Sequence, residues 1–373
     1  MNVGIIMPVA EQRGGSEKYL LDMLRAGRDT EINWVVILLE DGPMRAQIAA
    51  MGIRVEVITA KKFSKIGQTI QATLRIKDFC RKNNIGMVIG WMTKGHIYGS
   101  ISRLLGSPAL PVHFQHGYAN PPGGFDKLAL SLPVAGVLAC SRFVLDSQLA
   151  LYKNKARGFV AYPGVAVDEY SPATLPSMEE CRAKLGLPAS VPVIGTVGRL
   201  QHWKGMHTLI DALPAIHAKH PDAHVVLVGG THALEPDYEA FLQKRIADAG
   251  LQSHVRVTGF QSNIAEWMQA MSVFVHASNT EPFGIVVIEA MALGKPVIAG
   301  AQGGPREIIT EGENGLLAGF EDANAVANGV LRYLDDPGWA RQVGEKARVR
   351  AQDFSLAHCA EGVINAVREL GKK

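Results

Sequence analysis

The stretch EPFGIVVIE places two glutamates, Glu281 and Glu289, eight positions apart. Its apolar residues continue into AMALG, a pattern typical of a buried helix that begins near Ile285. One interpretation is structural, with Glu281 as the anion at the helix N-terminus. The other is chemical: unpaired N–H groups of the first helical turn suit a phosphate. In that case Glu289 would accept hydrogen bonds from a ribose, and Glu281 would face a reacting sugar.

A second candidate group is the cation pair in GTVGRLQHWKG, where Arg199 and Lys204 lie on either side of a turn before a predicted helix. The guanidinium fork of Arg199 and the point charge of Lys204 suit a diphosphate. Two solvated surface charges are the alternative. The stretch SVFVHAS is typical of a strand and leads directly into the glutamate motif. Because loops that follow parallel strands meet at one edge of the sheet, we expect both motifs at the same site.

A glycine pair, Gly14 and Gly15, follows the first apolar stretch and precedes a helix predicted from about Ser16. Glycines at such a place let backbone N–H groups approach an anion. An ordinary turn between strand and helix explains the same pattern. Neither a GxGxxG fingerprint nor a GxxxxGK[ST] loop follows a strand in this sequence, which argues against hydride transfer and ATP hydrolysis.

The elements that must position these motifs alternate between short β-branched runs and helical patterns. This alternation predicts parallel sheets with crossover helices. A proline-marked stretch interrupts the alternation, which then restarts, so the expected fold class is α/β with two Rossmann-like domains. The predicted divisions are an N-terminal domain at 1–165, a linker at 166–188, a C-terminal domain at 189–352 and a closing helix at 353–373.

The composition is that of an ordinary globular chain, with 373 residues of which 47% are hydrophobic and 20% charged. That length favours two domains. A formal net charge of +3 is too small to indicate a nucleic-acid partner. The four cysteines are far apart and lack CxxC spacing, which predicts neither a zinc site nor a disulfide framework and favours a reducing compartment. We expect no signal peptide and no membrane span, and therefore a cytoplasmic location.

These motifs together resemble those of the retaining nucleotide-sugar glycosyltransferases of family 4. Glu281 and Glu289 match the family's signature of two glutamates separated by seven residues. Arg199 and Lys204, in VGRL followed by KG, match its phosphate-binding cations, and GGSE matches its N-terminal glycine loop. GGPREII resembles the family's further loop and helix. The resemblance implies the GT-B fold, with two facing Rossmann-like domains, a cleft between them and a C-terminal helix that crosses back to the N-terminal domain.

The resemblance also implies an activity. A sugar would move, with retention, from a nucleotide-sugar donor to a glycan or lipid-linked acceptor in cell-surface polysaccharide or lipopolysaccharide synthesis. A UDP-sugar is favoured over a GDP-sugar. Charge on the leaving diphosphate would be stabilised by preorganised cations and N–H groups without a metal or other cofactor, and no Asp-x-Asp pair follows a strand. The residues Gln201, His202 and Trp203 before Lys204 depart from the family pattern, which bears on donor preference.

Residue roles follow from the same resemblance. His116, in FQHGY, lies where family members often place an active-site histidine, although a histidine of the core is the alternative. The candidate catalytic residues are His116, Arg199, Lys204 and Glu281. The candidate donor-binding residues are Gly14, Gly15, Arg199, Lys204, Phe260, Gln261, Phe283, Gly284, Ile285 and Glu289, with Phe260 and Gln261 expected near the base.

The N-terminal domain is expected to hold the acceptor, because its loops vary with substrate in such folds. Trp91, Lys94 and His96, in GWMTKGHIYG, are the acceptor candidates, since an aromatic face stacks on sugars. Trp91 could equally close the end of the sheet.

A basic segment from Lys61 to Lys82 has Ile66, Ile70 and Leu74 at helical spacing. It predicts one of two things. A basic amphipathic helix would make peripheral contact with an anionic membrane, here its inner face. A crossover helix with a solvated polar face fits the same sequence.

Two other classes of protein stay open. One is a sugar-nucleotide epimerase or another enzyme with two Rossmann-like domains, and an epimerase would release a rearranged sugar without using an acceptor. The other is a two-domain sugar-binding protein, which would turn over no donor. The clustering of Arg199, Lys204, Glu281 and Glu289 argues against the second class.

Overall fold

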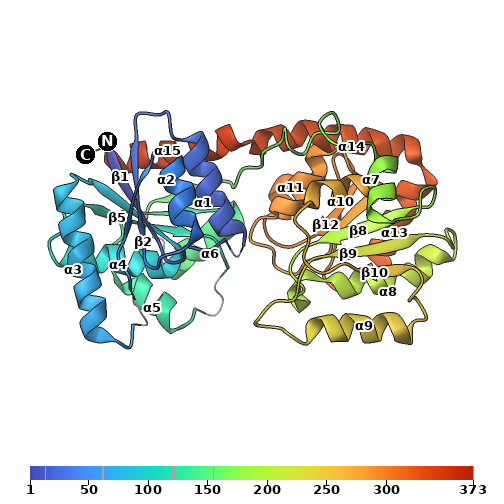
Figure 1. Ribbon diagram of the computed structural model, residues 1–373, viewed down its shortest axis with the longest axis horizontal. Coiled ribbons are helices and arrows are strands. Elements are labelled where there is room, and N and C mark those ends of the chain that lie inside the picture. The colour runs from blue at the N-terminus through green and yellow to red at the C-terminus, as the bar shows by residue number, and fades with distance from the viewer. Residues whose placement is uncertain (13, 61–62, 119–121, 154, 373) are drawn as a thin grey trace. The chain divides into compact units, whose positions relative to one another are not determined.

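A computed structural model of the chain describes residues 1–12, 14–60, 63–118, 122–153 and 155–372. The chain forms two compact units (Figure 1). The first comprises Met1–Gly164 together with Leu356–Lys373, and the second comprises Val165–Ser355. Each unit is built on one parallel sheet, so the prediction of two Rossmann-like α/β domains is confirmed.

The sheet of the first unit has the strand order β3-β2-β1-β4-β5-β6-β7, and all its described pairs are parallel. Ile5 of the first strand lies opposite Val36 on one side and Ile89 on the other. Strands of this kind are covered on both faces, which explains why they are continuous apolar runs rather than alternating patterns. The strands are β1 (Asn2–Met7), β2 (Asn33–Leu38), β3 (Arg54–Val57), β4 (Met87–Trp91), β5 (Leu110–Gln115), β6 (Gly136–Ala139) and β7 (Gly158–Val160).

The helices of the first unit include the last helix of the chain, which packs beside the first one (Figure 1). The C-terminal helix predicted to cross back to the N-terminal domain is therefore present. It buries Cys359, Val363 and Leu370 against this unit's core. The helices are α1 (Gly15–Ala26), α2 (Pro43–Ala50), α3 (Ile66–Lys82), α4 (Met92–Leu104), α5 (Gly124–Ser131), α6 (Arg142–Leu151) and α15 (Leu356–Gly371).

The sheet of the second unit has the strand order β10-β9-β8-β11-β12-β13, again with parallel pairs. Its strands are β8 (Val193–Val197), β9 (His224–Val228), β10 (Val255–Val257), β11 (Val273–His276), β12 (Val297–Gly300) and β13 (Leu316–Ala318). Its helices are α7 (Met178–Leu185), η1 (His202–Lys204), α8 (Met206–His217), α9 (Tyr238–Asp248), α10 (Ile264–Ala270), α11 (Ile285–Ala292), α12 (Pro305–Ile308), α13 (Ala323–Asp335), α14 (Pro337–Ala351) and η2 (Gln352–Phe354).

Each sheet has a point at which the order of strands reverses. In the first unit this point lies between β1 and β4, and in the second it lies between β8 and β11. Ligands of open α/β sheets bind beyond the carboxyl ends of the strands at such points. The loop after β8 carries Arg199 and Lys204, and the loop after β11 carries Glu281. The topology therefore brings the two charged motifs of the second unit to one place.

The stretch 166–188, expected to be a linker, is part of the second unit. Its helix α7 is held there by Arg182, which is buried and donates hydrogen bonds to the carbonyls of Ala270 and Ala189 and to the hydroxyl of Ser272. Among the described helices, none is long and apolar enough to cross a membrane.

Candidate functional site

The loops after β8 and β11 are in direct contact. The backbone N–H of Asn279 donates to the carbonyl of Trp203 over 2.8 Å. Gly205 has a φ of 68°, and a Cβ there would lie 1.9 Å from the carbonyl oxygen of Ala277. Only glycine combines this left-handed backbone with so close an approach at low cost. The KG dipeptide thus places Lys204 against the loop that holds the first glutamate.

Lys204 and Glu281 form a nearly buried ion pair at this contact. Lys204 Nζ lies 2.7 Å from Glu281 Oε2, and the two side chains are 12% and 10% exposed. Lys204 Nζ also lies 4.1 Å from the centre of the Trp203 ring, within cation–π range. The two residues that the sequence assigned to a phosphate and to a sugar are therefore partners of one another before any ligand binds.

His276 completes this group and was not predicted from the sequence. Its Nε2 lies 2.9 Å from Glu281 Oε2 at the carboxyl end of β11. Burial, the largest cause, lowers the pKa of His276, although Glu281 acts in the opposite direction. The neutral ring then donates Nε2–H to Glu281, while Nδ1 is buried without a hydrogen-bond partner among the described residues. The signal available in the sequence was its place, as a histidine that ends the strand before the glutamate motif.

The charge of Glu281 is set by two opposing effects. Burial raises its pKa, but the ammonium of Lys204 and the hydrogen bond from His276 outweigh burial, and the net result is a pKa well below the usual carboxyl range. Glu281 is therefore a carboxylate at neutral pH. Both of its partners contact Oε2.

The helix after Glu281 begins as the sequence predicted. Gly284 has a φ of 112° and is the N-cap of α11, so the first N–H groups of the helix start at Ile285. Glu289 lies in the second turn and is 5% exposed. The Phe283 side chain is 3% exposed and packs against Phe354 with ring centres 5.6 Å apart. A donor contact by Phe283 is therefore limited to its backbone.

The GGPREII loop is packed against the glutamate motif. The backbone N–H of Gly304 donates to the carbonyl of Glu281 over 2.8 Å. A Cβ at Gly303, where φ is 88°, would lie 2.0 Å from the same carbonyl oxygen. These contacts fix the backbone that carries the carboxylate, because any larger residue at Gly303 would push the two loops apart.

Arg199 is exposed and contacts a residue that the sequence interpretation did not include. Its Nη1 lies 3.1 Å from Nε2 of His232, in the loop after β9. The neighbouring loop after β10 carries Phe260, which is 82% exposed and lies beside Gly230. Gln261 donates to the carbonyl of Thr258 and accepts from the indole N–H of Trp267. The exposed ring of Phe260 thus stands at the same sheet edge as Arg199.

In the first unit, Gly14 is the N-cap of α1 and Gly15 is its first residue, as expected. The carbonyl of Ser16 accepts a hydrogen bond from the indole N–H of Trp91 over 3.1 Å. This contact joins the glycine loop after β1 to the end of β4 at the reversal point of the sheet. Arg13 lies outside the described residues.

His116 follows β5 and packs among aromatic rings. Its ring centre lies 4.3 Å from that of Phe114, 4.6 Å from Trp91 and 5.5 Å from Tyr19. Burial lowers its pKa to about 3, so the imidazole is neutral at physiological pH. Its Nε2 has no hydrogen-bond partner among the described residues. This nitrogen is buried, and the packing is that of a core histidine, so the structure does not separate this alternative from an active-site role.

Two of the three acceptor candidates of the first unit, Trp91 and His96, require correction. Trp91 is fully buried in the core, so its ring has no free face for a sugar and closes the end of the sheet instead. His96 is also fully buried, stacked on His113 with ring centres 4.4 Å apart, and burial lowers its pKa to about 4. Lys94 donates to the carbonyl of Ala60. The sequence placed these residues at or after the end of a strand but could not show how deeply they are buried.

A family model matches the second unit, and curated proteins are similar to part of the chain. Residues 177–350 match the family model described as Glycosyl transferases group 1. The D-inositol 3-phosphate glycosyltransferase of Corynebacterium urealyticum is 31% identical over 231 residues, or 61% of this chain and 54% of that protein. The lipopolysaccharide core biosynthesis mannosyltransferase LpsB of Rhizobium meliloti is 32% identical over 159 residues, or 42% of this chain and 45% of that protein. The chain thus spans about half the length of the curated relatives it matches.

Solved structures extend the likeness to both units. HepE of Anabaena in complex with UDP has a TM-score of 0.86 and 27% identity, over 99% of this chain and 100% of that one. Its complex with UDP-glucose gives a TM-score of 0.84 and 26% identity over 99% of this chain and 100% of that one. The two parallel-sheet domains are accordingly those of the GT-B class of glycosyltransferase folds. The segment that resembles the group 1 glycosyl transferases, residues 177–350, lies in the second of these two domains.

Proposed function

We propose that this protein is a retaining glycosyltransferase that moves a sugar from a nucleotide-sugar donor to a glycan or lipid-linked acceptor in cell-surface polysaccharide or lipopolysaccharide synthesis. The observation that carries the proposal is the buried pair of Lys204 and Glu281, 2.7 Å apart at the reversal point of the second sheet and next to the start of α11. Removing two charges from water costs free energy even when they are paired, and residues with perturbed pKa values are common at functional sites.

In the proposal, the diphosphate of the donor binds at the start of α11. The unpaired N–H groups near Ile285 and the positive end of the helix dipole attract the phosphate oxygens. Arg199 adds a guanidinium from the loop after β8, and Lys204 adds an ammonium from the same loop. As the bond to the sugar breaks, negative charge grows on the diphosphate, and these preorganised donors stabilise it without a metal. Glu289 accepts from the ribose hydroxyls.

Glu281 orients the sugar in this scheme. Because Lys204 and His276 both contact Oε2, Oε1 accepts from a sugar hydroxyl. A carboxylate beside the ring also favours the positive character that the sugar gains as the diphosphate departs. His276 holds the carboxylate in place through its Nε2–H, and the Gly303 and Gly304 contacts hold the backbone.

The donor is proposed to be a UDP-sugar, with a GDP-sugar as the alternative. Support comes from HepE, which is similar over the whole chain and whose solved complexes contain UDP and UDP-glucose. The proposed role in lipopolysaccharide synthesis is supported by the similarity to LpsB, which is named as a lipopolysaccharide core biosynthesis mannosyltransferase. The exposed ring of Phe260 is a candidate stacking partner for the base.

The first experiment is a thermal-shift screen of the full chain against UDP-glucose, GDP-mannose, UDP and GDP. A ligand that binds the native state raises the unfolding temperature by mass action. The donor that gives the largest shift then enters a turnover assay that measures free nucleoside diphosphate. A shift without any turnover would favour a sugar-binding protein, and an isomerised donor would favour an epimerase. No shift with any nucleotide sugar would contradict the proposal.

We also propose that α3 makes peripheral contact with an anionic membrane. The three apolar residues predicted at helical spacing face solvent: Ile66 is 70% exposed, Ile70 51% and Leu74 38%. The helix instead packs on its other side, through Ile76 and Phe79 among others. An exposed apolar stripe on a helix with basic residues suits the boundary between headgroups and acyl chains. Lys61 and Lys62, at the start of the basic segment, lie outside the described residues.

Vesicle cosedimentation tests this contact. The protein should pellet with phosphatidylglycerol vesicles, less so with neutral phosphatidylcholine, and should detach as salt screens the charges. Ile70→Glu should weaken the binding. Val349→Glu is the matched control, because Val349 is 71% exposed on α14 of the second unit. Equal recovery of Ile70→Glu and wild type would count against α3 as the membrane surface.

A further inference from the structure

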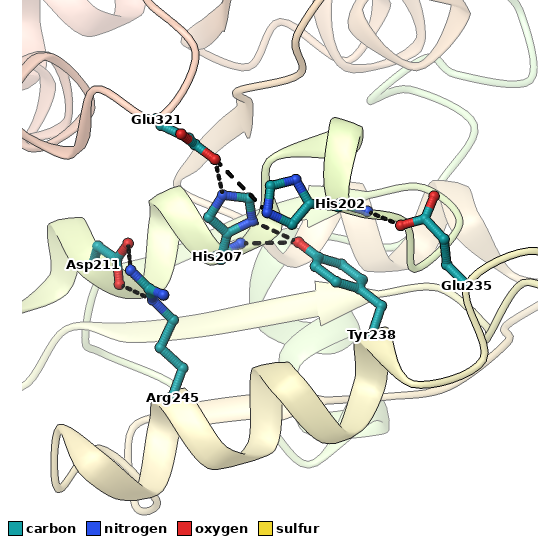
Figure 2. Close-up of polar contacts among 7 residues, drawn as sticks. All are labelled: His202, His207, Asp211, Glu235, Tyr238, Arg245 and Glu321. Atoms are coloured by element: carbon teal, nitrogen blue, oxygen red, sulfur yellow. Dashed lines mark hydrogen bonds and ion pairs between the residues drawn. The ribbon is translucent and has the colours of Figure 1, made fainter.

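Three side chains with metal-ligating atoms converge beside the loop that carries Lys204. They are His202 of η1, His207 in the first turn of α8, and Glu321 in the loop between β13 and α13. Figure 2 shows the two imidazoles and the carboxylate pointing toward one another. One ligand atom from each lies within 4.8 Å of the others. Among the described residues, this is the one group of histidine, cysteine or acidic side chains that meets this condition.

One separation matches the edge of a tetrahedral metal site, and a second is a few tenths of an ångström longer. Glu321 Oε1 lies 3.3 Å from His207 Nε2 and 3.7 Å from His202 Nε2. A zinc ion with ligands at about 2.0–2.1 Å in tetrahedral geometry sets neighbouring ligand atoms about 3.3–3.4 Å apart. The longer contact is beyond hydrogen-bond range. A shift of a few tenths of an ångström would bring it to the same length as the shorter one.

A neighbouring hydroxyl fixes the orientation of the His207 ring. Its Nδ1 lies 2.7 Å from the hydroxyl of Tyr238. Metal-binding histidines are commonly oriented in this way, by a hydrogen bond to the ring nitrogen that does not bind the ion. The Nε2 atom of His207 is the one that points toward Glu321.

Asp211, which lies one turn further along α8, is occupied elsewhere. Its two carboxylate oxygens accept from Nε and Nη2 of Arg245 at 2.5 and 2.7 Å (Figure 2). It is therefore engaged by a bidentate partner and does not compete as a fourth protein ligand. The carboxylate of Glu321, by contrast, is 52% exposed and contacts the two histidines.

We propose that His202, His207 and Glu321 form a binding site for a borderline transition-metal ion, for which Zn²⁺ is the best match. Two imidazoles and one carboxylate are a common zinc ligand set that leaves the fourth position to water. Carboxylate and water alone would instead favour Mg²⁺ or Ca²⁺. No ligand of this site is among the residues proposed to bind the donor.

The ion would tie together two loops of the second unit. His202 lies two positions before Lys204 in the same short helix η1, and Glu321 lies in the loop that leads to α13. Binding would therefore restrict η1 and stabilise the loop that presents Lys204, while the chemistry of sugar transfer would stay metal-free. Glu321 adopts a φ of 59°, a conformation that costs a non-glycine residue energy and that a bound ion would offset.

The test is a titration of the tag-free, metal-stripped full chain with Co²⁺, followed by the visible absorption of four-coordinate cobalt, and then with Zn²⁺ by calorimetry. We expect one equivalent to bind and Zn²⁺ to displace Co²⁺. Glu321→Gln and His202→Ala each remove a direct ligand at an exposed position and should weaken binding by more than about 100-fold. Tyr238→Phe removes the hydrogen bond to His207 Nδ1 and should weaken metal binding by about 10- to 100-fold. His207 is left intact because it is buried.

His254→Ala is the matched control. His254 belongs to a separate group of histidine rings, 4.7 Å from His217 and 5.1 Å from His224, and its loss should leave the one-equivalent signal unchanged. The proposal is overturned if wild type binds no Co²⁺ or Zn²⁺ stoichiometrically, if Glu321→Gln and His202→Ala bind as wild type does, or if His254→Ala removes the signal. Turnover of donor in EDTA is measured separately, so failure of this site and failure of the proposed activity are distinguishable.

Discussion

Removing one member of the Lys204–Glu281 pair tests the proposed chemistry most directly. The two side chains are 12% and 10% exposed, so each variant leaves a nearly buried charge without its partner. Such a loss typically costs about 3–5 kcal/mol of stability, which is less than the roughly 5–15 kcal/mol of a typical domain. Lys204→Met and Glu281→Gln preserve side-chain volume, and we expect both variants to fold with a lower unfolding temperature.

The effect on turnover should exceed the effect on donor binding. Each variant removes a charge that is proposed to act as the diphosphate departs, so kcat at saturating donor should fall by about 10²- to 10³-fold. If the two residues acted independently, the double variant would lose about 10⁴- to 10⁶-fold. Because Lys204 Nζ and Glu281 Oε2 are in contact, we expect instead that the double variant lies within about tenfold of the slower single variant.

The assay is steady-state release of nucleoside diphosphate, with single-turnover runs to separate chemistry from product release. Lys184→Met and Glu266→Gln are the controls. They break an ion pair of the same unit, 2.6 Å long but with side chains 59% and 19% exposed, and exposed pairs contribute little. Wild-type kcat in Lys204→Met and Glu281→Gln would refute a chemical role for the pair. A fully multiplicative double variant would refute the coupling.

Three further predictions rest on other features of the structure. Glu289→Ala should raise the donor KM by about 5- to 150-fold with little change in kcat, because a ribose hydroxyl loses its partner in both ground and transition states; a loss confined to kcat would contradict this role. Turnover measured well below the unfolding temperature should persist in EDTA, and a loss that Mg²⁺ or Mn²⁺ restores would show that the reaction needs a metal. Lys295 is buried, donates to the carbonyl of Gln269, and has a pKa lowered to about 7, mainly by burial. Between pH 7 and pH 10 the unfolded chain therefore binds more protons than the folded one, and the free energy of unfolding rises with pH by up to about 1.4 kcal/mol per unit. In chemical unfolding, the stability of wild type relative to Lys295→Met should rise over this range and be lost as pH falls toward 7. A constant difference between the two proteins would exclude the lowered pKa.

The architecture was predictable because its cause is local in the sequence. Strands such as β1 and β8 are buried on both faces, so they appear as short apolar runs, and the alternation with helices leaves only parallel crossover topologies. The start of α11 was predictable for a similar reason, since Gly284 permits the left-handed backbone that caps the helix.

The burial of individual side chains was not predictable in the same way. Trp91 ends β4 and His96 follows it in α4, as functional residues often do, but both are fully buried in the first unit. Ile66 and Ile70 have the spacing of a buried face, yet the helix turns its other side inward. Periodicity shows which residues share a face, whereas burial depends on which neighbours cover that face. This information lies in the tertiary packing.

The pairing of Lys204 with Glu281 changes what the site can do. From the sequence, the lysine belonged to the phosphate and the glutamate to the sugar, as two separate contacts. In the structure the carboxylate of Glu281 lies against the ammonium of Lys204 without any ligand. In the proposed mechanism, ground-state attraction for the diphosphate would therefore come mainly from the α11 N–H groups and Arg199. An interaction accelerates a reaction only if it is stronger in the transition state. Under the proposed mechanism, the leaving group gains negative charge while the sugar becomes more positive, so Lys204 and Glu281 would each gain a better partner at the same moment, which is the condition that catalysis requires.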